Sequence, residues 1–121
     1  MAEIVVGVDG SEHSVDALRW AAREAQLRST ALKVVASFAT PIMSTGYEVA
    51  VPDPSDLAAA SNTMLGAAID TIREEGALDG VDVVTEALEG HAGEQLIRLS
   101  ADAELLVVGA RGHGGFLGLL M

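Results

Sequence analysis

A glycine-rich segment near the end of the sequence has the residue types that can bind phosphate groups. It reads GARGHGG at residues 109–115, with four glycines and one arginine. Residues 105–108 before it are apolar, as in a strand that is buried on both faces of a parallel sheet. Glycines let the backbone turn tightly and leave its N–H groups uncovered, so a loop of this kind at the carboxyl end of a strand can hold a phosphate chain. A flexible glycine turn without a ligand is the alternative.

A second loop of interest follows the first apolar run, at Asp9-Gly10-Ser11. This triplet ends the run, and Ser11 or Ser14 can cap a helix that begins there. The positive N-terminal end of that helix would then add to an anion site near the loop. Gly7, just before the loop, would let a ligand approach the backbone closely, or would only relieve crowding between strand and helix.

Composition and charge exclude several classes of protein. With 121 residues the chain has room for one domain with one core, and no apolar run is long enough to predict a membrane span. No basic region precedes the first apolar run, so a secretory signal is not expected. The absence of cysteine excludes disulfides and thiolate metal sites, and a net charge of −11 argues against binding to nucleic acid or to an anionic membrane surface. A cytoplasmic protein is the simplest expectation.

Strand and helix patterns alternate along the chain. Apolar and β-branched runs predict strands at 3–8, 31–38, 81–86 and 104–109, and helical spacing predicts helices at about 12–28, 57–75 and 92–100. Ser55 and Asp56 are expected to cap the second helix, and Trp20 of the first helix is expected to pack in the core. The interval 39–56 holds all three prolines and is expected to be an irregular segment that is functional or mobile. The core-facing residues of the first two helices are expected to be Val15, Leu18, Ala22, Ala25, Leu57, Ala60, Met64, Leu65, Ala68, Ile69 and Ile72.

This alternation predicts an α/β fold, a doubly wound parallel sheet in a three-layer α/β/α arrangement with right-handed crossovers. The strand at 81–86 is placed nearer an edge, because Asp82 and Glu86 interrupt its apolar pattern. Ligands of such sheets bind outside the carboxyl ends of the strands, where the strand order reverses. If the first and fourth strands are neighbours, the loops that follow Val8 and Val108 face each other across one crevice.

Common nucleotide-binding motifs do not fit these loops. A P-loop needs a lysine after its glycines, but the only lysine is Lys33, near the start of the second strand. A nicotinamide-binding fingerprint would need G-x-G-x-x-G after the first strand, where only Gly7 and Gly10 are present. The sequence DGSEHS is too acidic for a flavodoxin-like phosphate loop. A receiver domain would need paired acids where Asp9 stands alone.

Four segments of the chain carry a family resemblance: IVVGVDGS at 4–11, ALRWAAREAQLR at 17–28, EGHAGEQLIRLSADAELLVVGARGHGG at 89–115, and FLGLLM at 116–121. With these segments the chain resembles the ATP-binding subclass of the universal stress proteins. The phosphate signature of that subclass is Gly-x-x-Gly, then nine residues, then Gly and Ser or Thr. Gly109 and Gly112 match its first half, and the nine residues 113–121 reach the last residue of the sequence. The resemblance implies one universal stress protein domain over 1–121 with an adenine nucleotide alpha hydrolase-like fold, incomplete at the C-terminus because the final helix and strand are missing.

The resemblance also implies a ligand and the residues that bind it. The cofactor would be ATP, with Mg²⁺ as an optional companion, and no catalytic or metal-ligating residue is assigned. Asp9 would accept hydrogen bonds from ribose hydroxyls or face metal-associated phosphate, with helix capping as the alternative. Arg111 would pair with phosphate oxygens or remain a solvated loop charge. The residues expected to bind the nucleotide are Gly7, Val8, Asp9, Ser37, Gly109, Ala110, Arg111, Gly112, His113, Gly114 and Gly115.

The expected function is that of an ATP-binding regulatory module in a stress response, and the complete protein is expected to form a homodimer. Fast ATP hydrolysis is not expected, because the candidate site offers one carboxylate, one arginine and no lysine. Two alternatives remain. One is a nucleotide-free universal stress protein that acts by dimerisation or partner binding, and the other is a slow nucleotide hydrolase.

Overall fold

Strands and helices alternate along the chain in the predicted order. The computed structural model describes residues 3–38 and 54–109, apart from the side chains of Pro54 and Ala92. The irregular interval expected from residue 39 therefore lies outside the described residues up to position 53, as do residues 110–121. The elements are β1 (Glu3–Gly7), α1 (Glu12–Arg28), β2 (Ala31–Phe38), α2 (Pro54–Glu74), β3 (Val83–Glu89), α3 (Ala92–Ser100) and β4 (Leu105–Val107).

The described strands form one parallel sheet in the order β3-β2-β1-β4. Ile4 of β1 is paired on one side with Leu32 of β2 and on the other with Leu105 of β4. The sheet thus grows outward from β1 in both directions, and the strand order reverses between β1 and β4. β3 lies at the outer end of the order, as its interrupted apolar pattern predicted.

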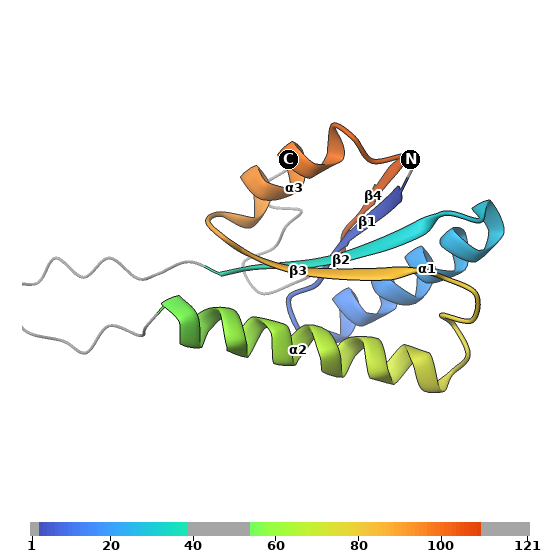
Figure 1. The fold of residues 1–121 in the computed structure, drawn as a ribbon, viewed down its shortest axis with the longest axis horizontal. Helices are drawn as coiled ribbons and strands as arrows, with labels where there is room; N and C mark the ends of the chain where they lie inside the picture. Colours follow the sequence, from blue (N-terminus) through green and yellow to red (C-terminus); the bar gives the residue numbers. More distant parts are fainter. Residues whose placement is uncertain (1–2, 39–53, 110–121) are drawn as a thin grey trace, which may run out of the picture.

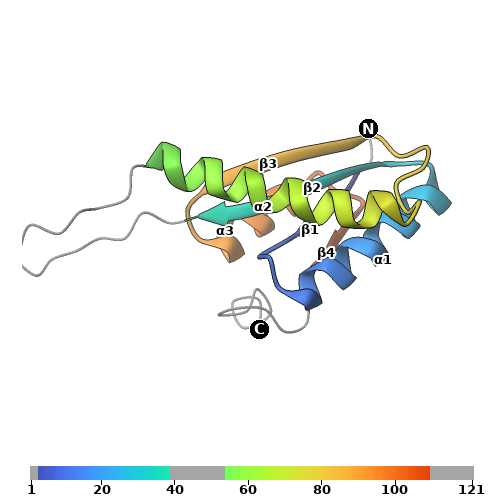
Figure 2. The same cartoon turned by 90° about the horizontal axis from the view of Figure 1, so that it is seen from below.

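Helices cover both faces of the sheet, which confirms the doubly wound α/β arrangement. Figures 1 and 2 show α1 and α2 together on one face and α3 on the other. The larger core lies under α1 and α2, where Leu18 and Ile72 are fully buried against Ile4 and Val34. A smaller core under α3 joins Leu96 to residues of the opposite sheet face.

Four elements have bounds that differ from the sequence prediction: β1 ends at Gly7, β4 is shortened to Leu105–Val107, and α2 and β3 are displaced. α2 begins at Pro54, so Ser55 and Asp56 lie inside its first turn and do not cap it. Proline suits this position because the first N–H groups of a helix have no partner within the helix. β3 runs from Val83 to Glu89, later than the predicted 81–86, since the N–H of Val81 is used in a turn, 3.0 Å from the carbonyl oxygen of Leu78.

Two expectations about the core are wrong. Trp20 is half-exposed on the outer side of α1 and is not a core residue. Ala60 is exposed near the start of α2, whereas Leu65, Ala68, Ile69 and Ile72 of the same predicted stripe are buried. The second half of α2 therefore packs on the sheet more closely than the first.

Candidate functional site

The carboxyl ends of β1 and β4 lie side by side, as the hypothesis of a shared crevice required. The strands are parallel neighbours, with Val6 paired to Val107. The chain therefore leaves the sheet at the same end of the strands after β1, at Gly7 and Val8, and after β4, at Val108 and Gly109. This edge is also the place where the strand order reverses, which is where open parallel sheets bind ligands.

A side chain of the loop after β1 orders the loop by accepting a hydrogen bond from its backbone. The backbone N–H of Ser11 donates to Asp9 Oδ1 at 2.9 Å, which closes a turn around Gly10. Gly10 itself has a φ of +87°, in the region that favours glycine. Asp9 therefore stabilises the turn that leads into α1, while the N-cap residue is Ser11, one of the two serines expected to cap this helix.

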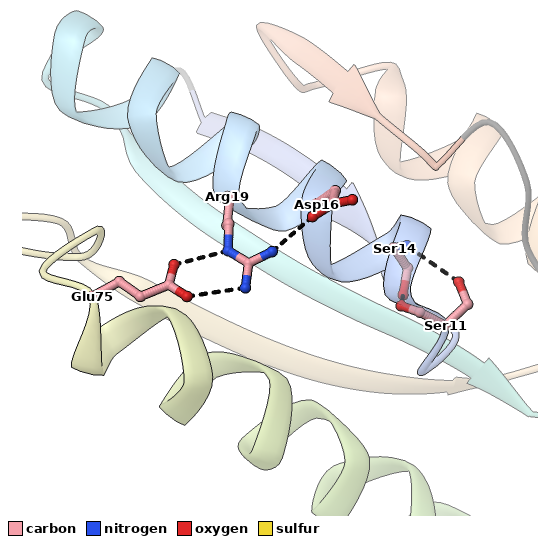
Figure 3. Close-up of polar contacts among 5 residues, drawn as sticks. All are labelled: Ser11, Ser14, Asp16, Arg19 and Glu75. Carbon is pink, nitrogen blue, oxygen red and sulfur yellow. Dashed lines mark hydrogen bonds and ion pairs between the residues drawn. The ribbon is translucent and has the colours of Figure 1, made fainter.

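Ser11 and Ser14 exchange hydrogen bonds at the first turn of α1 (Figure 3). The N–H of Ser14 donates to Ser11 Oγ at 3.2 Å, and the Ser14 hydroxyl donates to the Ser11 carbonyl oxygen at 2.8 Å. The helix begins immediately at the candidate site, so its positive end is directed toward the rim where an anion would bind.

Gly109 brings the end of β4 against this same helix start. A Cβ atom at Gly109 would lie 3.1 Å from the carbonyl carbon and oxygen of His13, and 3.2 Å from the backbone nitrogen of Ser14. These distances are tighter than most contacts of a Cβ atom, so a side chain at position 109 would require the start of α1 to shift by a few tenths of an ångström. The structure therefore places the start of the glycine-rich segment next to the N-terminus of α1, while Ala110, Arg111, Gly112, His113, Gly114 and Gly115 lie outside the described residues.

A small hollow at the carboxyl ends of β1, β2 and β3, beneath α3, has a cavity volume of about 10 Å³, enough for one water molecule. Gly7 and Ser37, both expected to bind the ligand, belong to its lining. The residues that line it are Gly7, Val35, Ala36, Ser37, Leu88, Gln95 and Leu96. Pockets that bury a whole ligand are larger, roughly 300–1,000 Å³.

Sequence reasoning missed Leu88 and Gln95 as pocket residues. Leu88 belongs to the last part of β3, beyond the predicted end of that strand. Gln95 is a polar residue on an amphipathic helix, and only the packing of α3 across the sheet brings it to the pocket. The sequence offered no local signal for either.

Several cations of the described ranges are held in ion pairs outside this rim. Arg19 of α1 forms a two-pronged pair with Glu75, at 2.8 and 2.9 Å, and also contacts Asp16 (Figure 3). Hydrogen bonds from Arg19 lower the pKa of the Glu75 carboxyl. Lys33 pairs with Glu86 at 2.8 Å. These charges connect elements of the fold, and the N-terminus of α1 adds backbone N–H groups as donors at the described rim.

Within residues 3–38 and 54–109, no group of three His, Cys, Asp or Glu residues is arranged to hold a metal ion. Among the same residues, no helix is both long and apolar enough to cross a membrane.

Comparison with known proteins identifies the family. The sequence pattern of the Universal stress protein family matches residues 1–121. The chain belongs to the universal stress protein family. The universal stress protein Rv2623 of Mycobacterium tuberculosis is 33% identical over 98% of this chain and 40% of its own length. The chain spans about two fifths of the length of the curated relatives that it matches.

Solved universal stress protein structures share the fold. One, a complex with cAMP, has a TM-score of 0.69 at 23% identity and covers 99% of this chain and 84% of its own. Another, from Archaeoglobus fulgidus in complex with dAMP, has a TM-score of 0.67 at 27% identity and covers 94% of this chain and 85% of its own. The sheet and the helices on its two faces thus form the adenine nucleotide alpha hydrolase-like fold of this family.

Proposed function

We propose that this universal stress protein binds ATP at the carboxyl rim of its sheet and acts as a regulatory module in a stress response. The observation that carries the proposal is the close approach of Gly109 to His13 and Ser14, because it joins the glycine-rich segment to the N-terminus of α1. Backbone N–H groups and a helix N-terminus are the donors that phosphate oxygens need. The related dAMP complex supports an adenine nucleotide as the ligand.

The two ends of the nucleotide would occupy different parts of the rim. The base would lie over the apolar hollow that Ser37, Leu88 and Leu96 help to line. The phosphates would lie toward the glycine-rich segment, with Gly7 allowing the ligand to pass close to the backbone of β1. Asp9, between these regions, would face the ribose hydroxyls or an ion bound to the phosphates.

Magnesium would enter with the nucleotide. Mg²⁺ is usually held by one or two carboxylates together with substrate phosphates, and Asp9 is a carboxylate of the described rim. We do not propose rapid hydrolysis, and bound ATP would act on conformation or assembly. We propose a homodimer in the cytoplasm as the working form. Nucleic acid is not proposed as a partner, because a net charge of −11 disfavours it.

Thermal unfolding with ATP, AMP, NAD and FMN tests this function. A ligand present at about 100 times its Kd stabilises a protein by roughly 2.7 kcal/mol, so binding of ATP should raise the Tm clearly. The Asp9→Ala and Gly112→Val variants should lose this rise. Asp102→Ala is the matched control, since Asp102 is exposed just before the amino end of β4 and should keep it. If ATP does not raise the Tm of the unmodified protein, the alternative remains of a universal stress protein that acts without a nucleotide.

A further inference from the structure

The side chain of Met64 covers the turn that follows β1. A Cβ atom at Gly10 would lie 3.4 Å from Met64 Cγ and 3.9 Å from Met64 Sδ, so the thioether fills the space beside Gly10 that a side chain would take. Met64 belongs to α2, whereas Gly10 lies in the loop between β1 and α1. The thioether is therefore an apolar contact between α2 and the loop at the candidate nucleotide site.

The covered turn carries the polar groups of the loop. Gly10 lies between Asp9, whose carboxylate accepts the hydrogen bond from the Ser11 N–H, and Ser11, the N-cap residue of α1. The backbone of α2 is held in place here, because Leu65, next to Met64, is fully buried in the larger core. A polar group on the Met64 side chain would thus press on the turn or move out into water. In both cases the turn loses its apolar cover.

Met64 has the chemistry and the exposure of an oxidation site. The chain contains four methionines and no cysteine, so its sulfur atoms all belong to thioethers. Met1, Met43 and Met121 lie outside the described residues, whereas Met64 is half-buried at the edge of the larger core and partly open to solvent. Oxidation of a methionine to its sulfoxide converts a flexible apolar side chain into a polar one, and enzymes can reverse the reaction.

We propose that oxidation of Met64 by a peroxide loosens the turn at Gly10 and thereby weakens nucleotide binding. A lone pair of Sδ forms the new S–O bond while the O–O bond of hydrogen peroxide breaks. The departing hydroxide takes the proton of the transferred oxygen and leaves as water. Sulfur loses two electrons in this step, and the peroxide gains them. The effect on affinity rests on the proposed function, whereas the effect on the turn does not.

Substitution of Met64 separates its oxidation from that of the other methionines. Met64→Leu is the matched control, because leucine keeps an apolar cover of similar volume, cannot be oxidised, and leaves the other three methionines in place. The whole chain and this variant are treated with hydrogen peroxide, and mass spectrometry of peptides measures the sulfoxide at each methionine. Calorimetric titration with ATP before and after treatment measures the affinity.

Oxidation should weaken ATP binding by the unmodified chain about tenfold, the size expected when an unpaired polar group replaces an apolar contact. The affinity of Met64→Leu should not change on the same treatment. Met64→Gln, which places a polar amide against the turn, should bind ATP weakly without any peroxide. Equal losses in the unmodified chain and Met64→Leu, full affinity after complete oxidation of Met64, or a Met64 that stays reduced while the other methionines are oxidised would overturn the proposal.

Hydrogen exchange without nucleotide separates this proposal from the proposed function. Oxidation of Met64 should speed exchange of the Ser11 N–H and of the Val15 N–H, which is bonded to the Ser11 carbonyl oxygen at 3.1 Å. The Gly90 N–H, bonded to the carbonyl oxygen of Phe38 at 2.8 Å, should exchange at its normal rate. If the unmodified chain binds no ATP, the proposed function fails, and faster exchange at Ser11 would still show that oxidation loosens the turn. Unchanged exchange at Ser11 and Val15 after complete oxidation would overturn the proposal with or without ATP binding.

Discussion

Gly109, two residues beyond β4, lies directly against the backbone of His13 in the first turn of α1. The distance from an added Cβ to the carbonyl carbon and oxygen of His13 would be 3.1 Å, shorter than ordinary van der Waals contact. The obstructing atoms belong to a helical backbone, which cannot rotate away as the end of a side chain can. The contact between the β4 end and the start of α1 therefore depends on the absence of a side chain at position 109.

Gly109→Ala should separate β4 from α1. We expect a loss of about 1–3 kcal/mol in the free energy of unfolding, as for other overpacked sites, together with weaker nucleotide binding. The matched control is Gly66→Ala in α2, where a Cβ would meet nothing within 4 Å. That change should stabilise the protein by up to about 1 kcal/mol, because alanine is the better helix former. Urea unfolding of both variants decides, and a Gly109→Ala variant as stable as the unmodified protein would contradict the structure.

Ser11→Ala should destabilise α1 at its first turn. The side chain of Ser11 caps the N–H of Ser14, and loss of such a cap costs roughly 0.5–2 kcal/mol. Ser11→Asp should recover most of the loss, since aspartate is an equally good N-cap and favours the positive end of the helix. Thermal unfolding of the two variants measures the difference, and the prediction is wrong if the alanine and aspartate variants are equally stable.

Glu75 should make stability depend on pH. Hydrogen bonds from Arg19 lower the pKa of Glu75 below its ordinary value of 4.5, so the unfolded chain takes up this proton before the folded one. The pair therefore stabilises the fold at neutral pH, and this contribution disappears as the pH falls from 4.5 through the lower pKa of the folded state. Glu75→Gln should unfold at lower urea than the unmodified protein at pH 7, and the two should converge in acid. A constant difference across this range would exclude the ion pair as the cause.

Thr30→Val should raise stability. Thr30 Oγ1 is buried without a hydrogen-bond partner among the described residues, and leaving a polar atom in that condition costs about 1–3 kcal/mol. Valine has nearly the same shape and no hydroxyl, so the variant should unfold at a higher urea concentration. Thr30→Ser keeps the hydroxyl and removes a methyl group, and it should not share the gain. Equal or lower stability of Thr30→Val would show that the hydroxyl finds a partner in solution.

Trp20→Ala should cost little for so large a side chain. Half of the Trp20 side chain is exposed, and surface substitutions usually change the free energy of unfolding by about 0.5 kcal/mol. Leu18→Ala, two residues earlier on the same helix but fully buried, should cost about 2–5 kcal/mol. Chemical unfolding of both variants tests the correction, and comparable losses would restore Trp20 to the core.

The arrangement of the strands was predictable because it follows from rules of connection. Alternating strands and helices require a parallel sheet, and the carboxyl ends of β1 and β4, which precede the two candidate loops, lie side by side in it. The helical period also predicts that Trp20 lies away from the core. It is two positions from Leu18, which places the two side chains on nearly opposite sides of α1, so size alone was a poor guide to burial.

The pocket was not predictable because its residues meet only through tertiary packing. Gln95 and Leu88 come from a helix and a strand whose positions depend on the whole sheet. The limits of β3 escaped prediction for a similar reason, since Glu89 joins the strand through its pairing with Phe38 and not through its own propensity. The start of α2 depended on Pro54, which sequence patterns mark equally as a loop residue or as a first helical residue.

The central place of β1 has a consequence for the synthesis of this protein. The ribosome makes β4, one of the two neighbours of β1, about a hundred residues after β1 itself. At roughly 5–20 residues per second, several seconds or more pass before that side of β1 can be covered. During this interval β1, which has four apolar or glycine residues after Glu3, is paired on one side only. Newly made chains therefore have their greatest need of chaperones before β4 is complete.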